Sequence, residues 1–509
     1  MSDRRPALLV LLAVILVYVP GLGGDWVWDD WVWKDQGAAA LIDGLGRQVY
    51  GGIWRPLSTL STMVVHVVWP DPLPHKVLNL VLHLVAVSAV AATARRLGAR
   101  PVAAWAGAAC FGLHPAVSET VCWVGARTEI LPATLLLVGI AAWSSGRRAV
   151  AAVCLGLAPF GKEAYGVAAL SLAIWMWTRR RWDFPLLAAV AGGAVAYVIA
   201  RGVVVGATIE GGDYALDPVP AFGAAALRGF VLLGDTAAAD LWNPYAGAPG
   251  LGWAVLIGGP LAVVLSRGRP ALGAVMAALP PLVPSALAAS STLLLADRYY
   301  YVPFAGLGVA AGLGLEWAAA RGQRSPVWAL LALVPLALGF ATARRSAEWR
   351  SELLLATSSW QRHPDNALAA EHYAYAEERW GRGCAAGLPA WRLAATLTPS
   401  GAAGLQRCLV RTGAYAEALA LTPSLRPTAD GALLAAEAAT ELGDLAAAER
   451  WARDAIAIDP TRPAPWVRLG FVLGLQGHAA DARAAVDEAL RLDPADSDAR
   501  TLRSLQDAE

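Results

Sequence analysis

The chain has 509 residues, of which 57% are hydrophobic and only 16% are charged, and its formal net charge is +1. Soluble proteins carry about 25% charged residues, so this composition excludes an ordinary soluble enzyme and indicates a polytopic membrane protein. Nothing in it suggests a nucleic-acid-binding protein. The residues after 343 are less apolar and carry a net charge of −4. We therefore predict a membrane domain over residues 1–343 and a soluble domain over residues 344–509.

Eleven apolar runs approach the length of about 20 residues that a membrane-spanning helix needs. The first run follows Arg4-Arg5 and resembles a signal peptide, but we interpret it as an uncleaved span because ten more runs follow. Residues 222–240 are interrupted by charged residues, so we expect them to be re-entrant or interfacial. The predicted spans are residues 6–23, 77–94, 101–118, 130–145, 149–161, 164–178, 184–206, 251–266, 271–292, 301–319 and 326–343.

Arginines are concentrated in six short loops that alternate with longer, more acidic loops. Arginine-rich loops face the cytoplasm by the positive-inside rule. The chain then begins inside, ends outside, and exposes a long first outer loop over residues 24–75. Arginine far outnumbers lysine, which suggests a bacterial protein of the inner or plasma membrane, with a periplasmic or extracellular outer side. The cytoplasmic arginines are Arg4, Arg5, Arg95, Arg96, Arg100, Arg147, Arg148, Arg179, Arg180, Arg181, Arg267, Arg269, Arg321 and Arg324.

The acidic pair Asp29-Asp30 lies in this outer loop, shortly after the first apolar run and within a tryptophan-dense segment. Alternating tryptophans are typical of an aromatic belt at the membrane surface. Ionisable residues near membrane depth are costly and mark functional sites. Two adjacent carboxylates also repel each other, which favours proton uptake by one of them. We therefore treat Asp29 and Asp30 as candidate catalytic residues.

Further polar groups are predicted on the same outer side, and each alone has a structural interpretation as an interhelical hydrogen bond, an ion pair or a belt tyrosine. His75, Asn79 and His83 follow at intervals of four residues, which places them along one helix face. At least six groups fall at the same depth, so we expect a cavity with both carboxylates and cations. The candidate binding residues are Arg55, His75, Asn79, His83, His114, Glu119, Arg127, Glu129, Lys162, Glu163, Arg298 and Tyr299.

The spacing of the histidines and cysteines gives little evidence for a metal site or a disulfide framework. No two histidines lie three or four residues apart, so ligand spacing does not support a divalent metal site, and no other cofactor is predicted. Three of the five cysteines lie in or near apolar segments and are expected in the core. Cys384 and Cys408 can pair only if their domain lies outside the cytoplasm.

The tail contains an internal repeat with an offset of 34 residues, which aligns Gly443 with Gly477 and Asp459-Pro460 with Asp493-Pro494. This period and composition are typical of tetratricopeptide repeats, each a pair of antiparallel helices. Weaker copies over 364–399 and 400–423 bring the expected number to about four pairs, with a capping helix after Ser497. Such arrays form a concave surface that holds peptides. A purely structural tail is the alternative.

The order of these motifs resembles that of the transmembrane and tetratricopeptide-repeat O-mannosyltransferases, which are GT-C glycosyltransferases. The resemblance rests on the acidic pair after the first span, Arg55-Pro56-Leu57, Asn79 with His83, His114-Pro115 with Glu119, and Lys162-Glu163, followed by the repeats. It covers nearly the whole chain. The segment after the acidic pair, Trp31-Val32-Trp33-Lys34, departs from the family pattern. The implied fold class is all-α, a membrane helix bundle of about 11 spans followed by a repeat solenoid.

The resemblance implies transfer of a sugar, such as the hexose mannose, from a polyprenyl-phosphate donor to a protein hydroxyl on the extracytoplasmic side. Asp29 is then the general base, and Asp30 orients the acceptor or Asp29. A phosphate leaving group departs without protonation but needs cations near it. The expected cations are Arg127, Lys162 and Arg298, with Arg55 and His83 behind them. The partners are the lipid-linked donor, a polypeptide held by the repeats, and membrane lipid.

Other readings remain open at this point. A GT-C transferase that modifies a glycolipid or a surface polysaccharide, with the repeats serving assembly, is the nearest. A membrane-anchored repeat scaffold for envelope assembly is a second alternative, although one span suffices for an anchor. A transporter is a third, and neither an inverted repeat nor paired broken helices supports it.

Overall fold

The structure is a computed structural model that describes residues 4–30, 34, 53–206, 218–234, 249–292, 296–321, 324–396 and 398–508. Part of the predicted outer loop 24–75, including Trp31 and Trp33, lies outside these residues. The chain divides into two compact units, Met1–Leu355 and Ala356–Glu509. The boundary predicted at residue 343 falls within helix α17 (Arg324–Glu348). The regular elements of the described residues are helices.

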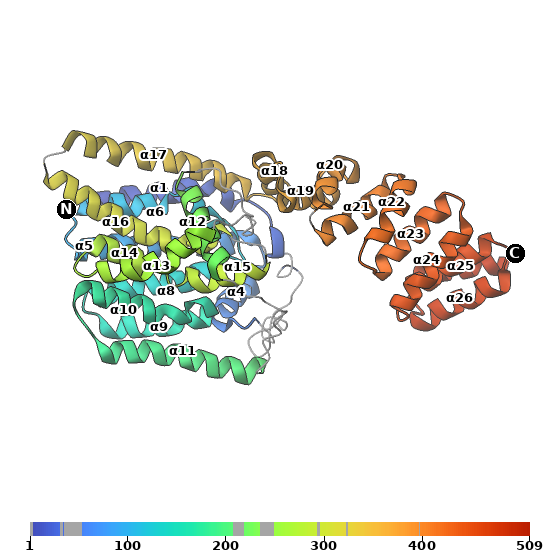
Figure 1. The fold of residues 1–509 in the computed structure, drawn as a ribbon, viewed down its shortest axis with the longest axis horizontal. Coiled ribbons are helices and arrows are strands. Elements are labelled where there is room, and N and C mark those ends of the chain that lie inside the picture. The colour runs from blue at the N-terminus through green and yellow to red at the C-terminus, as the bar shows by residue number, and fades with distance from the viewer. Residues whose placement is uncertain are drawn as a thin grey trace. The chain divides into compact units, whose positions relative to one another are not determined.

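The first unit is a bundle of apolar helices that run alongside one another (Figure 1). By length and composition, four helical segments among the described residues are long and apolar enough to cross a membrane. They are α1 (Arg4–Leu22), α5 (Pro72–Arg96), α11 (Phe184–Val205), and the turn η4 (Asp297–Tyr300) continued by α16 (Tyr301–Ala320). A fifth results if Pro115–Cys122 and α8 (Arg127–Ser144), which meet at 113°, count as one bent span.

Of the remaining predicted spans, 326–343 lies within the long helix α17, and the others coincide with shorter helices or helix pairs. The prediction of one span over 271–292 was wrong, because Pro280-Pro281 separates two helices. Proline lacks a backbone N–H and disfavours helical geometry in the residue before it. The other helices of this unit are α4 (Pro56–Val68), α6 (Pro101–Gly112), α7 (Ser118–Cys122), α9 (Arg148–Gly161), α10 (Ala168–Arg179), α12 (Pro218–Gly234), α13 (Pro249–Leu265), α14 (Pro270–Ala278) and α15 (Leu282–Thr292).

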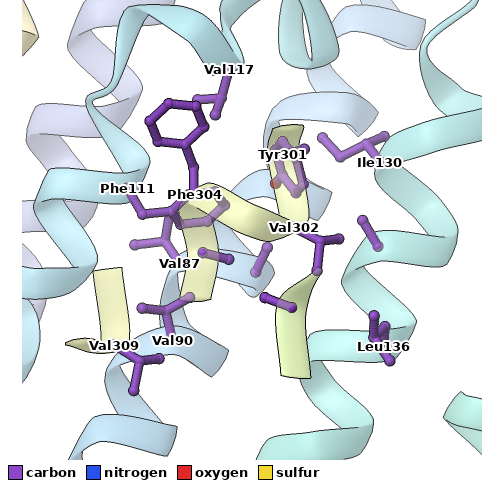
Figure 2. Packing of buried hydrophobic residues seen from close by; sticks show 14 of the residues in the cluster. Val87, Val90, Phe111, Val117, Ile130, Leu136, Tyr301, Val302, Phe304 and Val309 are labelled. Carbon is purple, nitrogen blue, oxygen red and sulfur yellow. The ribbon is translucent and has the colours of Figure 1, made fainter. Parts of the chain in front are cut away.

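The core of the bundle lies between α5, α6, α8 and α16, where branched and aromatic side chains interdigitate (Figure 2). Among them, Val87, Phe111 and Tyr301 are at most 1% exposed. Lipid tails are as apolar as these side chains, so close packing rather than escape from water holds such helices together.

Glycines let α6 and α16 approach at the level of the backbone. A Cβ added to Gly107 would lie 2.3 Å from the Gly308 carbonyl oxygen and 2.5 Å from the Gly312 nitrogen. No real Cβ tolerates such contacts, so this crossing requires glycine at position 107. Gly314 lies further along α16, and no atom falls within 4 Å of the Cβ it would carry.

Short elements gather at one end of the bundle and carry the acidic pair and its candidate partners. The 3-10 turns η2 (Pro115–Val117) and η4 contact each other and α7, and α15 contacts both η4 and η3 (Glu163–Val167). Proline and glycine at the helix ends produce this change from long helices to short turns. The irregular backbone is therefore concentrated where the predicted site lies.

The second unit consists of stacked helix pairs (Figure 1), as the 34-residue period predicts. Gly443 and Gly477 adopt φ values of +77° and +82° at the turn inside their pairs, a conformation that glycine adopts without strain. The pairs are α19 (Ala367–Trp380) with α20 (Cys384–Ala394), α21 (Pro399–Arg411) with α22 (Tyr415–Leu421), α23 (Ala429–Glu441) with α24 (Leu445–Ile458), and α25 (Pro463–Leu475) with α26 (Ala479–Leu492); α18 (Glu352–Arg362) precedes them and α27 (Ser497–Ala508) follows.

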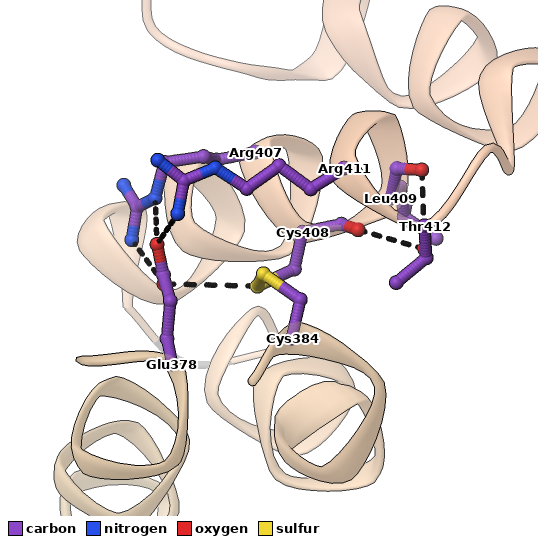
Figure 3. Close-up of a disulfide and its surroundings, with 7 residues drawn as sticks. All are labelled: Glu378, Cys384, Arg407, Cys408, Leu409, Arg411 and Thr412. Carbon is purple, nitrogen blue, oxygen red and sulfur yellow. Dashed lines mark hydrogen bonds and ion pairs between the residues drawn. A yellow bond between two sulfur atoms is a disulfide. The ribbon is translucent and has the colours of Figure 1, made fainter. Parts of the chain in front are cut away.

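A disulfide joins the first two pairs of the array (Figure 3). Cys384 begins α20 and Cys408 lies in α21, with their Cα atoms 5.1 Å apart. Beside it, Glu378 accepts hydrogen bonds from Arg407 and Arg411. The bond closes a loop across 24 positions of sequence, which stabilises the repeats by limiting the freedom of the unfolded chain.

The glycine crossing yields a matched test. We expect Gly107→Ala to lower the free energy of unfolding by about 1–3 kcal/mol, because its methyl group overpacks the α6–α16 contact. Gly314→Ala should be neutral or slightly stabilising, because alanine favours a helix and has open space there. Thermal unfolding of the detergent-purified variants measures both effects. Equal melting temperatures for the two variants would contradict the close crossing.

Candidate active site

The acidic pair lies on a strained 3-10 turn, η1 (Trp28–Asp30). Trp28 adopts a φ of +54°, in the left-handed region, which costs a non-glycine residue about 1–3 kcal/mol. Its ring is packed edge-on against Trp123 and Trp349, at centroid distances of 5.2 and 5.1 Å. Such a conformation persists only where the surroundings impose it, and it is concentrated at functional sites.

The two carboxylates occupy different surroundings. Asp30 is fully buried, and its Oδ1 and Oδ2 accept hydrogen bonds from the backbone N–H groups of Gly125 (2.8 Å) and Val27 (3.4 Å). Burial raises the pKa of Asp30 to about 7, although these hydrogen bonds and the charge of Lys76 oppose the rise. Asp29 is exposed. A substrate can therefore reach Asp29, while Asp30 fixes the turn.

Arg127 and Asn79 hold the segment against which this turn rests. The Arg127 guanidinium is buried and donates to Asn79 Oδ1, to the His75 carbonyl (2.8 Å) and to Ser61 Oγ (3.4 Å). The Asn79 amide then donates to the Trp123 carbonyl oxygen at 2.8 Å. This geometry favours a positioning role for the two residues, because their polar atoms face protein groups.

Two buried ion pairs bring residues of four elements together. Glu119 of α7 pairs with Arg298 of η4, and its other oxygen accepts the Arg298 backbone N–H at 3.0 Å. Glu129 of α8 pairs with Lys162 and also accepts a hydrogen bond from the Tyr165 hydroxyl. Arg298 is 20% exposed and Glu119 only 1%, so the cation faces the surface and the carboxylate stays beneath it.

A third pair and one tyrosine complete the cluster. Arg55 Nε donates to Glu163 at 2.9 Å as part of a two-point contact. Partial burial alone would raise the pKa of Glu163, but the Arg55 charge and hydrogen bonds lower it to about 2. The Tyr299 ring lies 4.6 Å from Lys162 Nζ and 5.0 Å from Arg298 Cζ, and it interacts electrostatically with Arg55. The cations Arg55, Lys162 and Arg298 therefore converge on Tyr299.

Trp123 connects this cation cluster to the acidic turn. Its indole N–H donates to the Val27 carbonyl at 3.2 Å, and its ring contacts Trp28. The same ring lies 5.0 Å from Arg298 Cζ, a cation–π contact. One indole therefore contacts both the acidic turn, through Trp28, and Arg298 of the cation cluster.

The predicted histidines are buried and contact groups other than Tyr299. His83 is fully buried, with ring nitrogens 2.7 Å from the Tyr301 hydroxyl and 3.1 Å from a backbone carbonyl. His114 packs on Phe304 at a centroid distance of 4.2 Å, and its Nδ1 accepts the backbone N–H two residues on. His75 is fully buried among aromatic rings. These are packing contacts and backbone hydrogen bonds, and none of them involves Tyr299.

Four residues that make polar contacts at this end were not among the sequence candidates. Arg228 of α12 forms a buried ion pair with Asp297, next to Arg298. Lys76 is fully buried and donates to backbone carbonyls of α1 and of Trp349. Glu352 accepts the backbone N–H of Trp28 at 2.6 Å. Arg228 and Asp297 interrupt apolar runs, which is a usable signal, whereas nothing local marks Glu352.

The described residues contain one group of three potential metal ligands close enough to share an ion, Glu378 with Cys384 and Cys408. The two cysteine sulfurs of that group are bonded to each other. The acidic pair and the Tyr299 cluster do not form such a group within the described part of the chain.

Comparison with known proteins identifies the repeats directly. Residues 439–505 match the family model of the tetratricopeptide repeat. Part of the chain is similar to the crystal structure of YrrB, described as a TPR protein with an unusual peptide-binding site, at 15% identity and a TM-score of 0.26; the match covers 30% of this chain and 82% of YrrB. A search of curated proteins finds no match.

A second similarity covers most of the chain. It is to the apo oligosaccharyltransferase of Archaeoglobus fulgidus, at 12% identity and a TM-score of 0.38, and it covers 68% of this chain and 56% of that enzyme. The chain thus spans little more than half the length of this neighbour. Both TM-scores lie below 0.5, so neither similarity decides the function.

The buried Arg228–Asp297 pair anchors the Tyr299 cluster, because Tyr300 also donates to the Ala225 carbonyl of α12 at 2.6 Å. We expect Asp297→Ala to cost about 3–5 kcal/mol, because it leaves the buried guanidinium without its carboxylate. Glu417→Ala, which breaks the exposed pair with Arg392, should cost less than about 1 kcal/mol. Denaturant unfolding of both variants compares them, and similar losses would contradict the anchoring role.

Proposed function

We propose that the protein is an integral-membrane glycosyltransferase that moves a sugar, a hexose such as mannose, from a polyprenyl-phosphate donor to a hydroxyl group of a protein. Transfer takes place on the extracytoplasmic side. The observation that carries the proposal is the arrangement around Trp123, whose ring contacts both Trp28, the neighbour of the exposed Asp29, and Arg298 of the cation cluster. A base and an anion-binding group linked through one residue suit a reaction that deprotonates one substrate and releases a phosphate from the other.

The proposed reaction needs one base. Asp29 takes the proton of the acceptor hydroxyl as its oxygen attacks the anomeric carbon of the sugar. The bond between that carbon and the phosphate oxygen breaks, and the electron pair leaves with the polyprenyl phosphate. This leaving group is already an anion, so no second carboxylic acid is required, in contrast to glycoside hydrolysis. Asp30 holds the turn that presents Asp29.

The departing phosphate needs positive charge, which the ion-paired cations supply. Arg298 is the first candidate, because it is the cation in contact with Trp123 and is partly exposed. Lys162 contacts the same Tyr299 ring as Arg298 and is nearly buried, at 9% side-chain exposure. Arg127 has its donors on protein groups. We therefore assign phosphate stabilisation to Arg298 with Lys162, and positioning to Arg127.

Two features support an extracytoplasmic site in a bacterial inner or plasma membrane. The arginine-rich loops leave the acidic pair and the tail on the side opposite the cytoplasm. The Cys384–Cys408 disulfide supports the same location for the tail, because disulfides persist in oxidising compartments. Nucleotide sugars are absent there, and a lipid-linked donor fits the membrane setting.

The repeats supply a surface for a polypeptide acceptor. A groove of about 640 Å³ runs along the first helices of successive pairs and onto α27. Apolar side chains such as Leu434 and Phe471 line it together with charged ones such as Arg468. Apolar pockets with a few polar groups are typical of ligand-binding grooves.

Purified protein tests the catalytic assignment. With a polyprenyl-phosphate mannose donor and an acceptor peptide rich in serine and threonine, we expect the wild type to release polyprenyl phosphate and to add a hexose mass to the peptide. Asp29→Asn should reduce transfer by at least about a hundredfold, because the amide cannot accept the proton. Its thermal unfolding should match that of the wild type, since Asp29 is exposed. Retained transfer by Asp29→Asn would refute the assignment of the base.

A comparison of acceptors decides whether the enzyme glycosylates proteins or surface glycans. We expect sugar transfer to peptide and no transfer to a glycolipid or polysaccharide acceptor offered with the same donor. Deleting residues 364–509 should weaken transfer to long polypeptides more than transfer to short peptides, because only the former reach the repeats. Equal losses, or a preference for the glycolipid, would favour a transferase for surface glycans.

The buried carboxyl predicts a pH dependence. Since burial raises the pKa of Asp30 to about 7, its charge is lost as the pH falls through neutrality. The hydrogen bonds that it accepts from the turn weaken with that charge, so transfer should decline from about pH 8 to about pH 6. In Asp30→Asn the side chain at position 30 does not ionise, so the residual transfer activity of this variant should not decline between about pH 8 and about pH 6. The same decline in Asp30→Asn would assign it to another group.

A further inference from the structure

The acidic turn is held by the segment 349–352, at the start of α18. The backbone N–H of Trp28 donates to Glu352 Oε2 at 2.6 Å, across 324 residues of sequence. Three residues earlier, the backbone N–H of Asp25 donates to the Arg350 carbonyl at 2.9 Å. The Trp28 ring packs against Trp349. Two backbone donors and one ring of the turn segment therefore meet this short stretch.

The fit of the two segments leaves little space. A Cβ added to Gly24 would lie 2.4 Å from the Arg350 Cα and 2.6 Å from its carbonyl oxygen. Glycine at this position lets the backbones touch, so the entry to the turn is set by 349–352 rather than by the turn itself.

The conformation of Trp28 needs an external support. Its left-handed φ is one of two positive values among the described non-glycine residues, and the other, at Arg180, closes a helix. The Trp28 N–H is directed away from η1 and finds its acceptor in the Glu352 carboxylate, which is only 5% exposed. A hydrogen bond from a backbone N–H to a buried carboxylate is among the stronger ones that proteins form.

We infer that Glu352 is a positioning residue for the acidic pair. Its carboxylate fixes Trp28 in the left-handed conformation, and this fixes the direction in which Asp29 leaves the turn. The inference rests on the proposed function for its effect on sugar transfer. Its structural content, the Glu352–Trp28 contact, stands independently of the reaction.

Measurements of kcat and KM distinguish a positioning role of Glu352 from a general loss of stability. Glu352→Ala removes the acceptor and should lower kcat for sugar transfer about tenfold to a hundredfold, because a misplaced base loses its geometry. The KM for the polyprenyl-phosphate donor should stay within about twofold, because the cations at Tyr299 are untouched. Glu352→Gln keeps an acceptor oxygen and should retain most of the turnover. Glu348→Ala is the matched control, since Glu348 is the last residue of α17, four positions before Glu352, and pairs with Arg345.

A double substitution tests the route through Trp28. Glycine adopts a positive φ without strain, so Trp28→Gly makes the support from Glu352 unnecessary. Trp28→Gly will itself lower kcat, because the indole ring is lost. Adding Glu352→Ala to this variant should cause no further loss of kcat. Full additivity of the two losses would overturn the inference.

Hydrogen exchange provides a readout that does not require activity. In purified full-length protein, Glu352→Ala should speed exchange at the Trp28 amide about tenfold or more, because that amide loses its acceptor. Exchange in the repeat helices should not change. If Glu352→Ala fails to fold, Glu352→Asp, which keeps the negative charge at the start of α18 but shortens its reach, should give the same local increase.

The outcomes are distinct. Unchanged hydrogen exchange at the Trp28 amide in Glu352→Ala and in Glu352→Asp would overturn the positioning role. An equal increase in Glu348→Ala would overturn it as well. A wild-type protein that transfers no sugar would refute the proposed function, while exchange at Trp28 would still decide the role of Glu352.

Discussion

Charge pairing at one end of the bundle is the constraint on which the rest of the site depends. Glu119 and Glu129 are at most 3% exposed, and a buried carboxylate without a partner costs several kcal/mol. Each takes a cation from a distant element, which fixes η4 against α7 and the start of η3 against α8. The Tyr299 ring contacts both of these cations. The position of the cation cluster follows from the need to neutralise two acids in an apolar bundle.

The acidic turn is built by a different rule, because it relies on backbone contacts rather than on ion pairs. The Asp30 carboxylate of this turn accepts hydrogen bonds from the backbone N–H groups of Gly125 and Val27. The ring of Trp28 packs against the indoles of Trp123 and Trp349. Trp123 belongs to both arrangements through its indole N–H and its ring. Trp123 therefore links the acidic turn to the cation cluster.

Much of the fold was predictable from the sequence, because apolar runs and a 34-residue period are local signals. The helix pairs of the tail and the capping helix α27 lie where the repeat predicts. The break at Pro280-Pro281 was missed because the apolar character continues across it. Most of the ionic residues of the site were also recognisable by type, since charges are rare in apolar surroundings. Their pairing was not, because Glu119 and Arg298 are separated by 179 residues. Glu352 has no local signal at all, and its role follows only from a contact with a left-handed backbone.

The pairing of Arg55, Lys162 and Arg298 with carboxylates has a consequence for any anion that enters. The three pairs sum to no net charge, so an incoming phosphate meets a set of fixed dipoles rather than a pool of positive charge. Fixed dipoles act over a few ångströms and decay quickly beyond that range. Such a site attracts its anion only at contact, releases it without the long-range pull of an excess cation, and responds little to the ionic strength of the medium outside.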